Sequence, residues 1–393
     1  MNNRILVISF YTYPCKLVGA KRISYFVNYL VKQGVNITLI RSDNESIDFQ
    51  TDDRLALDPE INVIEIGNLR KRNTHVQTIH RFLKFYKAIH DILIEDKFDF
   101  MYFSGGPFFY FPLGIIFKFK NKIPYILDFR DLWVVGVRKI LNWKGRLLLK
   151  IERLFEKESI KHADLIISVS SKINELFKEK YEHKKKLNIL TILNGYNDKE
   201  LPEIDRNYRN KCELVKIGIF GKFSYYNSGH LQILIEAIRA IKSSVNIQIH
   251  HISIFEEDFM QTVSMNNLNE NFIFTGFKNY SEGIKYLYDM DFLILNNRTK
   301  YALGTKIFDY LYLNKPIMIF MTADSEIWKL LSDFSNTYLI QNSEDMIIAI
   351  KELLNSNDWN VIDRKMLQTY SRKYQTEKLY KYFINSGLLK ADN

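Results

Sequence analysis

The sequence predicts an α/β protein of two domains, each built on a parallel, doubly wound sheet. Short apolar segments with the pattern of buried strands alternate with longer segments of helical period along the chain, as expected when crossover helices join parallel strands. A length of 393 residues with 47% hydrophobic and 14% aromatic residues is ample for two cores. A polar, Pro-containing segment at 196–213 separates the two halves and reads as a linker.

The first predicted domain covers residues 1–195. The apolar run Ile5–Phe10, a turn-rich loop at 11–19, a helical pattern from Ile23 to Leu30 and a strand at 36–40 form a β-α-β start. Further helices are predicted at 75–95, 108–119, 143–161 and 171–181, and further strands at 98–103, 125–128, 165–169 and 189–193.

The second predicted domain covers residues 214–363. Its strands are predicted at 215–220, 246–254, 272–274, 291–295 and 317–321, and its helices at 231–241, 282–288, between 305 and 314, and at 343–354. An amphipathic helix at 364–383, within a C-terminal segment 364–393, has no following strand, so we expect it to pack back on the first domain.

The stretch from Gly304 to Met321 combines features of an anion-binding site. Thr305 is predicted as the N-cap of the helix, and Lys306 adds a positive charge where backbone N–H groups and the helix dipole favour an anion. Asp309 lies three residues further on the same face, where it could bind a ribose hydroxyl. The alternative is an ordinary exposed Lys-Asp pair on a helix surface.

Three charged residues, Asp128, Arg130 and Asp131, follow a predicted buried strand. Ligands of doubly wound sheets bind at the carboxyl ends of strands, so these residues are candidates for catalysis. The alternative is a buried structural ion pair with Trp133 packed beside it.

Composition excludes several classes of protein. The hydrophobic content excludes disorder, and Cys15 and Cys212 cannot form a disulfide framework or a metal site with the eight histidines, which favours a reducing compartment. The N-terminal apolar run lacks the features of a signal peptide, and the longest interior apolar run, Phe108–Phe117, is too short to span a bilayer.

The net charge of +10 is concentrated in one segment. Residues 138–186 hold 14 Lys and Arg against 7 Asp and Glu, and the stretch from Arg138 to Lys161, extended by Lys184–Lys186, interleaves charges with large apolar residues. This pattern predicts docking on anionic lipid rather than on nucleic acid, because no nucleic-acid-binding motif is present. The alternative is a solvated helix face.

Seven short motifs, in order along the chain, resemble those of the retaining glycosyltransferases of family 4, which have the GT-B fold. In the first half they are Gly19-Ala20-Lys21-Arg22, Asp128-Phe129-Arg130-Asp131-Leu132-Trp133, Ala163–Ser170 and Asn194-Gly195; in the second they are Gly221-Lys222, Phe274-Thr275-Gly276 and Gly304–Tyr310. The Asp-Phe-Arg-Asp-x-Trp signature resembles the bacterial polysaccharide-biosynthesis branch. The resemblance implies two Rossmann-like domains facing each other across a cleft, with the nucleotide in the second and the acceptor against the first.

The resemblance also assigns the donor site. It implies that Asp309 is the second acidic residue of the E-x7-E pattern, whose first position is occupied here by Tyr301. The lysine that usually follows Gly221-Lys222 is replaced by a polar stretch, so Lys306 is expected to share the diphosphate charge with Lys222, Gly304, Thr305 and the Gly19 loop. Retention follows from the family alone, and no metal or cofactor is expected because lysines and helix N-termini can stabilise the leaving group.

These observations predict a cytoplasmic enzyme held on the inner face of the cell membrane. It would move a sugar from a nucleotide-sugar donor to a lipid-linked saccharide or another cell-surface glycan precursor. The alternatives are a sugar-nucleotide epimerase on the same fold, a non-catalytic basic binding protein, and an inactive partner subunit in view of Tyr301.

Overall fold

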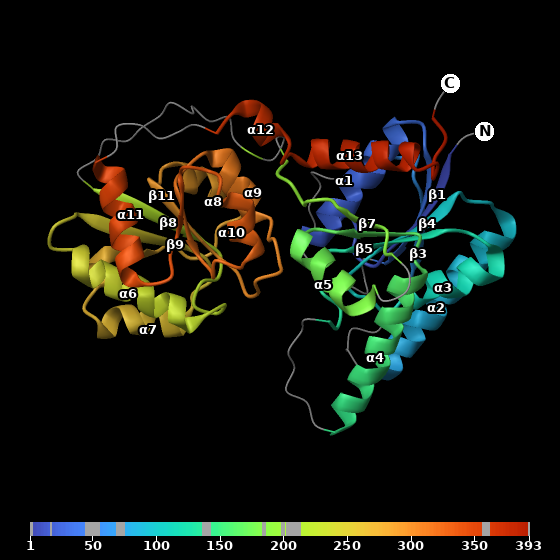
Figure 1. Cartoon of the computed structure of the whole chain (residues 1–393), viewed down its shortest axis with the longest axis horizontal. Coiled ribbons are helices and arrows are strands. Elements are labelled where there is room, and N and C mark those ends of the chain that lie inside the picture. The colour runs from blue at the N-terminus through green and yellow to red at the C-terminus, as the bar shows by residue number, and fades with distance from the viewer. Residues whose placement is uncertain are drawn as a thin grey trace. The chain divides into compact units, whose positions relative to one another are not determined.

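The structure is a computed structural model, and it describes residues 3–15, 18–43, 56–67, 75–135, 143–182, 186–197, 201, 214–355 and 362–391. The chain forms two compact units (Figure 1). The first combines residues 1–193 with residues 375–393, and the second is residues 194–374.

Among the described residues, the first unit has a parallel seven-stranded sheet of order β3-β2-β1-β4-β5-β6-β7. Its strands are β1 (Arg4–Ser9), β2 (Asn36–Ser42), β3 (Asn62–Ile66), β4 (Phe100–Ser104), β5 (Tyr125–Phe129), β6 (Leu165–Ser168) and β7 (Ile189–Thr191). Its helices are α1 (Val18–Lys32), α2 (His75–Glu95), α3 (Phe111–Asn121), α4 (Trp143–His162), α5 (Ser171–Tyr181) and most of α13 (Arg372–Asn385).

Helices cover both faces of this sheet, as its continuously apolar strands require. On one face, α1 and α13 share a core in which the rings of Phe26 and Phe383 lie 6.2 Å apart. On the other, α5 places Phe177 4.8 Å from Phe129 at the end of β5, and α4 is tied to β5 by a hydrogen bond from the Tyr125 hydroxyl to the Ser159 carbonyl.

The second unit has a parallel six-stranded sheet of order β10-β9-β8-β11-β12-β13 among its described residues. Its strands are β8 (Val215–Phe220), β9 (Ile247–Ile252), β10 (Phe272–Phe274), β11 (Phe292–Asn296), β12 (Ile317–Phe320) and β13 (Thr337–Leu339). Its helices are α6 (Ser228–Ile241), α7 (Glu257–Met265), α8 (Tyr280–Tyr288), α9 (Lys306–Leu313), α10 (Glu326–Leu331), α11 (Ser343–Asn355) and α12 (Arg364–Gln368), with a 3-10 turn at Asn269–Asn271.

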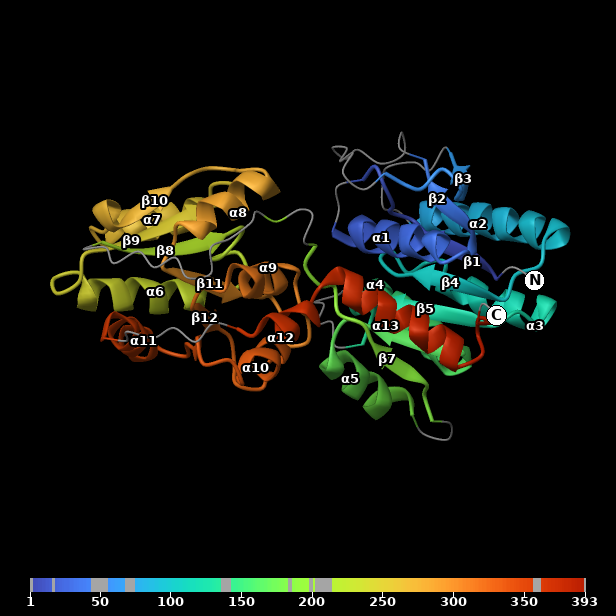
Figure 2. The same cartoon turned by 90° about the horizontal axis from the view of Figure 1, so that it is seen from above.

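The core of the second unit lies between its sheet and α6, α7 and α11. Figure 2 shows α8 and α9 with the strands of the same unit. Two glycines let α8 approach β8 closely. A Cβ atom on Gly218 of β8 would lie 2.7 Å from Leu287 of α8, and one on Gly283 of α8 would lie 2.4 Å from the Phe220 ring. The second sheet is therefore also packed on both faces.

The structure departs from the prediction in a few elements. The predicted helix at 364–383 is broken into α12 and α13, because Tyr196 accepts the Arg372 N–H at 2.7 Å and donates its own N–H to the Tyr370 carbonyl at 3.1 Å. These bonds replace helical ones at the break. The elements β3, α7, α10 and β13 were not predicted; α7, for example, buries only Phe259 and Val263 and so carries a weak apolar period. No helix in the described ranges is both long and apolar enough to cross a membrane.

Candidate functional site

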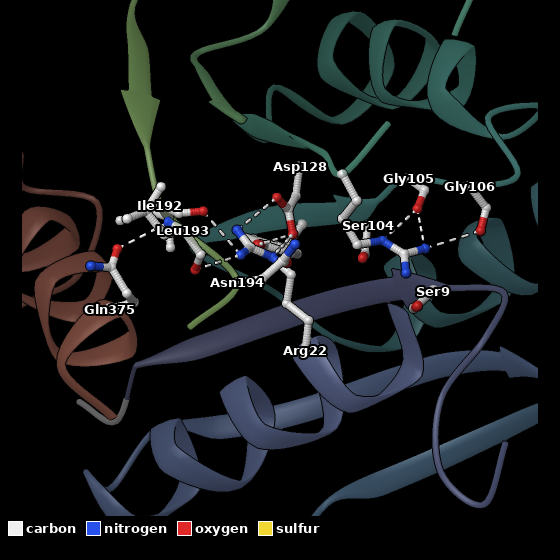
Figure 3. Close-up of polar contacts among 12 residues, drawn as sticks. Ser9, Arg22, Ser104, Gly105, Gly106, Asp128, Ile192, Leu193, Asn194 and Gln375 are labelled. Carbon is white, nitrogen blue, oxygen red and sulfur yellow. Dashed lines mark hydrogen bonds and ion pairs between the residues drawn. The ribbon is translucent and has the colours of Figure 1, made fainter. Parts of the chain in front are cut away.

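The candidate site of the first unit lies where the strand order of its sheet reverses, between β1 and β4. Loops from the two neighbouring strands diverge at such a point, which is where doubly wound sheets bind ligands. Gly19, in the first turn of α1, follows β1, and Gly105 and Gly106 follow β4. Arg130, one residue past β5, reaches back to this point and bonds the two carbonyls shown in Figure 3.

The Arg130 guanidinium is held by backbone carbonyls and packs against Gly19. Its Nε donates to the Gly105 carbonyl at 2.8 Å, and Nη2 donates to the carbonyls of Gly105 and, at 3.1 Å, Gly106. A Cβ atom on Gly19 would lie 0.9 Å from Arg130 Nη1, so any side chain there would displace the guanidinium. Because these acceptors are neutral, the positive charge remains available to an anion near the α1 N-terminus. The structure thus brings the predicted residues Gly19 and Arg130 together.

Asp128 is buried and paired with Arg22, as the alternative of a structural ion pair expects, and its catalytic role stays a prediction. It is 0% exposed, and its two oxygens accept hydrogen bonds from Arg22 Nε and Nη2, both at 3.1 Å. The Tyr102 hydroxyl donates to the same carboxylate at 2.9 Å. The reason is that β5 continues to Phe129, so Asp128 is a strand residue on the face covered by α1.

The Arg22–Asp128 pair has a positioning role. Arg22 Nη1 also donates to the carbonyls of Ile192 and Leu193, both at 3.0 Å, and the Leu193 N–H donates to Gln375 at 3.0 Å (Figure 3). The pair therefore fixes the chain that follows β7, where the first unit ends.

Asp131 is the exposed member of the predicted trio. It is the first residue of the loop 131–135, which is held by hydrogen bonds to Glu156 of α4. The buried Glu156 carboxylate accepts the N–H groups of residues 134 and 135 at 3.1 and 3.0 Å and the Tyr181 hydroxyl at 2.7 Å. Burial raises the pKa of Glu156, although these hydrogen bonds oppose the shift. The loop that presents Asp131 is thus tied to the body of the unit.

The candidate site of the second unit lies at the corresponding reversal of its own sheet, between β8 and β11. Gly221 and Lys222 follow β8, and Lys306 begins α9 after β11. The Lys306 Nζ donates to the Phe220 carbonyl at 2.6 Å, and a Cβ atom on Gly221 would lie 3.1 Å from the same Nζ. The Lys222 Nζ lies 4.0 Å from the centroid of the Tyr225 ring. Lys222 and Lys306, predicted from motifs far apart in the sequence, therefore both lie at this end of the sheet.

Lys306 is electrostatically unusual. Burial lowers its pKa to about 8, and the carboxylates of Glu256 and Asp309 act in the opposite direction. A lysine with this pKa is still mostly charged at pH 7, and a bound diphosphate would favour its charged form further.

Glu256, which lies after β9, holds the loop that carries Lys222. Its carboxylate accepts the N–H groups of Phe223 at 2.9 Å and Ser224 at 2.8 Å. His251 Nε2 lies 3.1 Å from the Gly221 carbonyl, and burial lowers the pKa of His251, which keeps the ring neutral at pH 7. Two side chains, His251 of β9 and Glu256 just after it, therefore hold the loop in place.

Asp309 and Thr305 differ from their predicted geometry. Asp309 is only 4% exposed, and its Oδ1 accepts a hydrogen bond of 2.7 Å from the Tyr280 hydroxyl at the start of α8. Thr305 is the N-cap residue of α9, as predicted, but its backbone is helical and its side chain accepts no capping hydrogen bond.

Tyr301 and Gly304 lie in the loop between β11 and α9. Tyr301 is half-buried, with the Lys300 Nζ 5.7 Å from its ring centroid. Gly304 is exposed, and a Cβ atom there would meet no atom within 4 Å. The space beside Gly304 is therefore open.

Sequence reasoning missed the residues that position this site: Arg22, Tyr102, Glu156, His251, Glu256 and Tyr280. Most act across 25 or more positions of sequence, so no local pattern identifies them. Arg22 is the exception, because it lies four residues before Phe26 on the buried stripe of α1. An arginine on such a stripe signals a buried partner. Among the described residues, no group of three or more His, Cys, Asp or Glu side chains could hold a metal ion.

Comparisons with known proteins agree with this architecture. Residues 19–200 match the family model described as Glycosyltransferase Family 4. A search of curated proteins finds no match. Sucrose-phosphate synthase from Thermosynechococcus elongatus superposes with a TM-score of 0.73 at 13% identity, covering 98% of this chain and 99% of that one.

Two further solved structures share the fold over nearly their whole length. HepE of Anabaena in complex with UDP has a TM-score of 0.64 at 12% identity, covering 97% of this chain and all of that one. UDP-GlcNAc 2-epimerase from Methanocaldococcus jannaschii has a TM-score of 0.56 at 13% identity, with 98% and 100% covered. The predicted GT-B class of fold is confirmed. Residues 19–200 are therefore similar to glycosyltransferase family 4.

Proposed function

We propose that the protein transfers a sugar from a nucleotide-sugar donor to a lipid-linked saccharide or another cell-surface polysaccharide precursor, with retention and without a metal ion. The observation that carries the donor assignment is the meeting of Lys306 with the Gly221-Lys222 loop where the strand order of the second sheet reverses. A diphosphate bound there would face two ammonium groups and the N-terminus of α9.

The chemistry asks the site to stabilise a leaving group. Negative charge grows on the diphosphate as the glycosyl bond breaks, and fixed cations in a partly buried position stabilise that charge without rearranging. Lys306 and Lys222 would supply this charge in the second unit. Asp309 would bind the ribose hydroxyls once the Tyr280 hydroxyl shares or yields its oxygen. Gly304, Thr305 and Tyr301 would border the donor sugar.

UDP is the nucleotide that we propose first, since the Anabaena protein of the same fold was crystallised with it. In the first unit, the exposed Asp131 and the fixed Arg130 would face the acceptor. With two cysteines and no disulfide framework, the chain suits a reducing compartment. We therefore propose a cytoplasmic enzyme attached to the inner face of the membrane, where a lipid-linked acceptor lies.

The donor proposal is tested by thermal-shift measurements with UDP, GDP, ADP and CMP sugars, because a ligand that binds the folded state raises its apparent stability. Lys306→Ala and Asp309→Ala should each lower kcat/KM by about 10- to 100-fold, the loss expected for one charge-assisted hydrogen bond. Lys351→Ala, on the exposed side of α11, is the matched control. Parental turnover by both site variants would refute the assignment.

A sugar-nucleotide epimerase is the second candidate, because the Methanocaldococcus epimerase shares the fold. The two activities differ in their need for an acceptor. An epimerase converts its sugar nucleotide with no acceptor present, whereas a transferase releases nucleoside diphosphate in proportion to acceptor. Binding without turnover under either condition would instead support a non-catalytic partner.

A further inference from the structure

The outer face of α4 carries large apolar side chains that are exposed in the described part of the chain. The helix is fixed by its opposite side, where Glu156, Ser159 and Ile160 are 0% exposed. The Tyr125 hydroxyl donates to the Ser159 carbonyl at 2.6 Å, and Glu156 binds the loop after β5. The outer face is therefore held in one orientation.

Five large apolar side chains lie on this outer face, which we call the apolar arc. Each is between 43% and 70% exposed: Trp143, Leu147, Ile151, Leu154 and Phe155. At 100° per residue they span roughly 120° of the helix surface. Soluble proteins rarely leave so contiguous an apolar surface in water unless a partner covers it.

A basic arc borders the apolar arc along the same helix. It consists of five exposed residues on roughly 80° of the surface: Arg146, Lys150, Arg153, Lys157 and Lys161. One acidic residue, Glu158, falls within the apolar arc toward the C-terminal end of α4, and it is paired with Lys161 at 3.9 Å and with His162 at 3.4 Å. The outer face thus combines Trp, Phe and Leu with a row of cations.

We propose that the outer face of α4 inserts into the surface of a bilayer that contains anionic phospholipid, with the apolar arc among the acyl chains and the basic arc at the headgroups. This composition is that of helices that lie in the membrane interface, whose apolar side enters about 5–10 Å. A solvated face would not need the apolar arc. A second copy of the chain is disfavoured because it would add another row of cations to the first.

The role that we give this surface rests on the proposed lipid-linked acceptor. The membrane binding itself does not depend on that proposal. An attachment that rested on charge alone would be weakened by salt. The apolar arc predicts instead that high salt removes the preference for anionic lipid while part of the binding to vesicles remains. Residues 138–142 and Lys184 and Lys185, which belong to the basic stretch predicted to dock on lipid, lie outside the described residues.

The test is co-sedimentation of the full chain with vesicles of phosphatidylcholine alone and of phosphatidylcholine with phosphatidylglycerol. The parent should bind both, and the anionic vesicles more tightly. The variant Leu147→Ser/Ile151→Ser/Leu154→Ser should lose roughly tenfold or more in partitioning to both kinds of vesicle. The variant Lys150→Gln/Arg153→Gln/Lys157→Gln should lose on the order of a hundredfold on anionic vesicles and little on neutral ones.

Matched controls are Met265→Ser for an exposed apolar residue and Lys351→Gln for an exposed cation, both in the second unit. All these side chains are exposed, so circular dichroism and thermal unfolding should match the parent. Undiminished binding by the triple serine variant, or no binding by the parent to either vesicle, would overturn the proposal. The proposal would also be overturned if the parent were a dimer and the triple serine variant a monomer. Donor binding is measured by thermal shift without vesicles. The donor proposal and the membrane proposal can therefore fail separately.

Discussion

The proposed chemistry depends on the protonation of Lys306, which is partly buried. Burial lowers its pKa to about 8, so the charge that would bind diphosphate is present below that pH and is lost above it. The value of kcat/KM, which reports the free enzyme, should therefore fall as pH rises through about 8. In Lys306→Arg this fall should disappear, because arginine stays charged.

Unfolding cannot produce the same fall. The folded chain binds this proton less tightly than the unfolded chain, in which lysine has a pKa of about 10.4. Between those two values the unfolded state holds more protons, so the Lys306 contribution to the free energy of unfolding rises with pH. A pH profile that is identical in the parent and in Lys306→Arg would count against the role of this ammonium group.

Gly19 and Arg130 should act as one unit. In Gly19→Ala the new Cβ would overlap Arg130 Nη1, so the guanidinium must leave its place beside the α1 N-terminus. We expect kcat/KM to fall about as far as in Arg130→Ala, on the order of tenfold or more, with thermal stability changed much less. In the Arg130→Ala background, Gly19→Ala should have little further effect. Additive losses would show that Gly19 acts separately.

Asp128 should matter for stability more than for chemistry. Asp128→Ala leaves the buried Arg22 guanidinium without its carboxylate, and breaking a buried pair in this way costs about 3–5 kcal/mol. Urea unfolding should show this loss, and Tyr102→Phe, which removes one hydrogen bond, should show a loss of about 1 kcal/mol. An Asp128→Ala protein as stable as the parent but inactive would restore the catalytic assignment.

At the scale of elements, the loop after β8 depends on a carboxylate from the extension of β9. Glu256 accepts N–H groups of residues 223 and 224, so Glu256→Ala should free the loop that carries Lys222. We expect faster amide exchange at residues 222–226 and a fall in donor use of about tenfold. Glu257→Ala, on the neighbouring exposed position at the start of α7, is the control. Unchanged exchange in Glu256→Ala would show that the loop is held by its backbone alone.

The elements themselves were predictable wherever their apolar period was strong. The strands at 215–220 and 272–274 agree at both ends with β8 and β10. Gly221 ends the first, and the polar residues Asn271 and Thr275 flank the second. The helix expected at 364–383 was interrupted, because backbone groups near residue 371 pair with Tyr196 rather than with their own helix. Pairings between distant backbones leave no local sequence signal.

For the whole molecule, we expect sugar transfer to persist in excess EDTA. We expect the cations of Lys222 and Lys306, both in the second unit, to offset the charge of the leaving diphosphate without a divalent ion. Turnover should be measured with EDTA and again after adding Mg²⁺ or Mn²⁺ in excess of chelator. Complete loss in EDTA that either metal restores would contradict this prediction.

The sequence by itself determined that the chain has two doubly wound sheets, because the alternation of buried strands and amphipathic helices is a local property. It also pointed to Gly19, Arg130, Lys222 and Lys306, which follow strands or begin helices where such sheets bind ligands. Only the tertiary structure decided what each side chain contacts. It buried Asp128 against Arg22, joined Asp309 to Tyr280, and left one side of α4 apolar and exposed. A side chain's partner depends on which distant strand or helix lies beside it, and that is fixed only when the sheets are assembled.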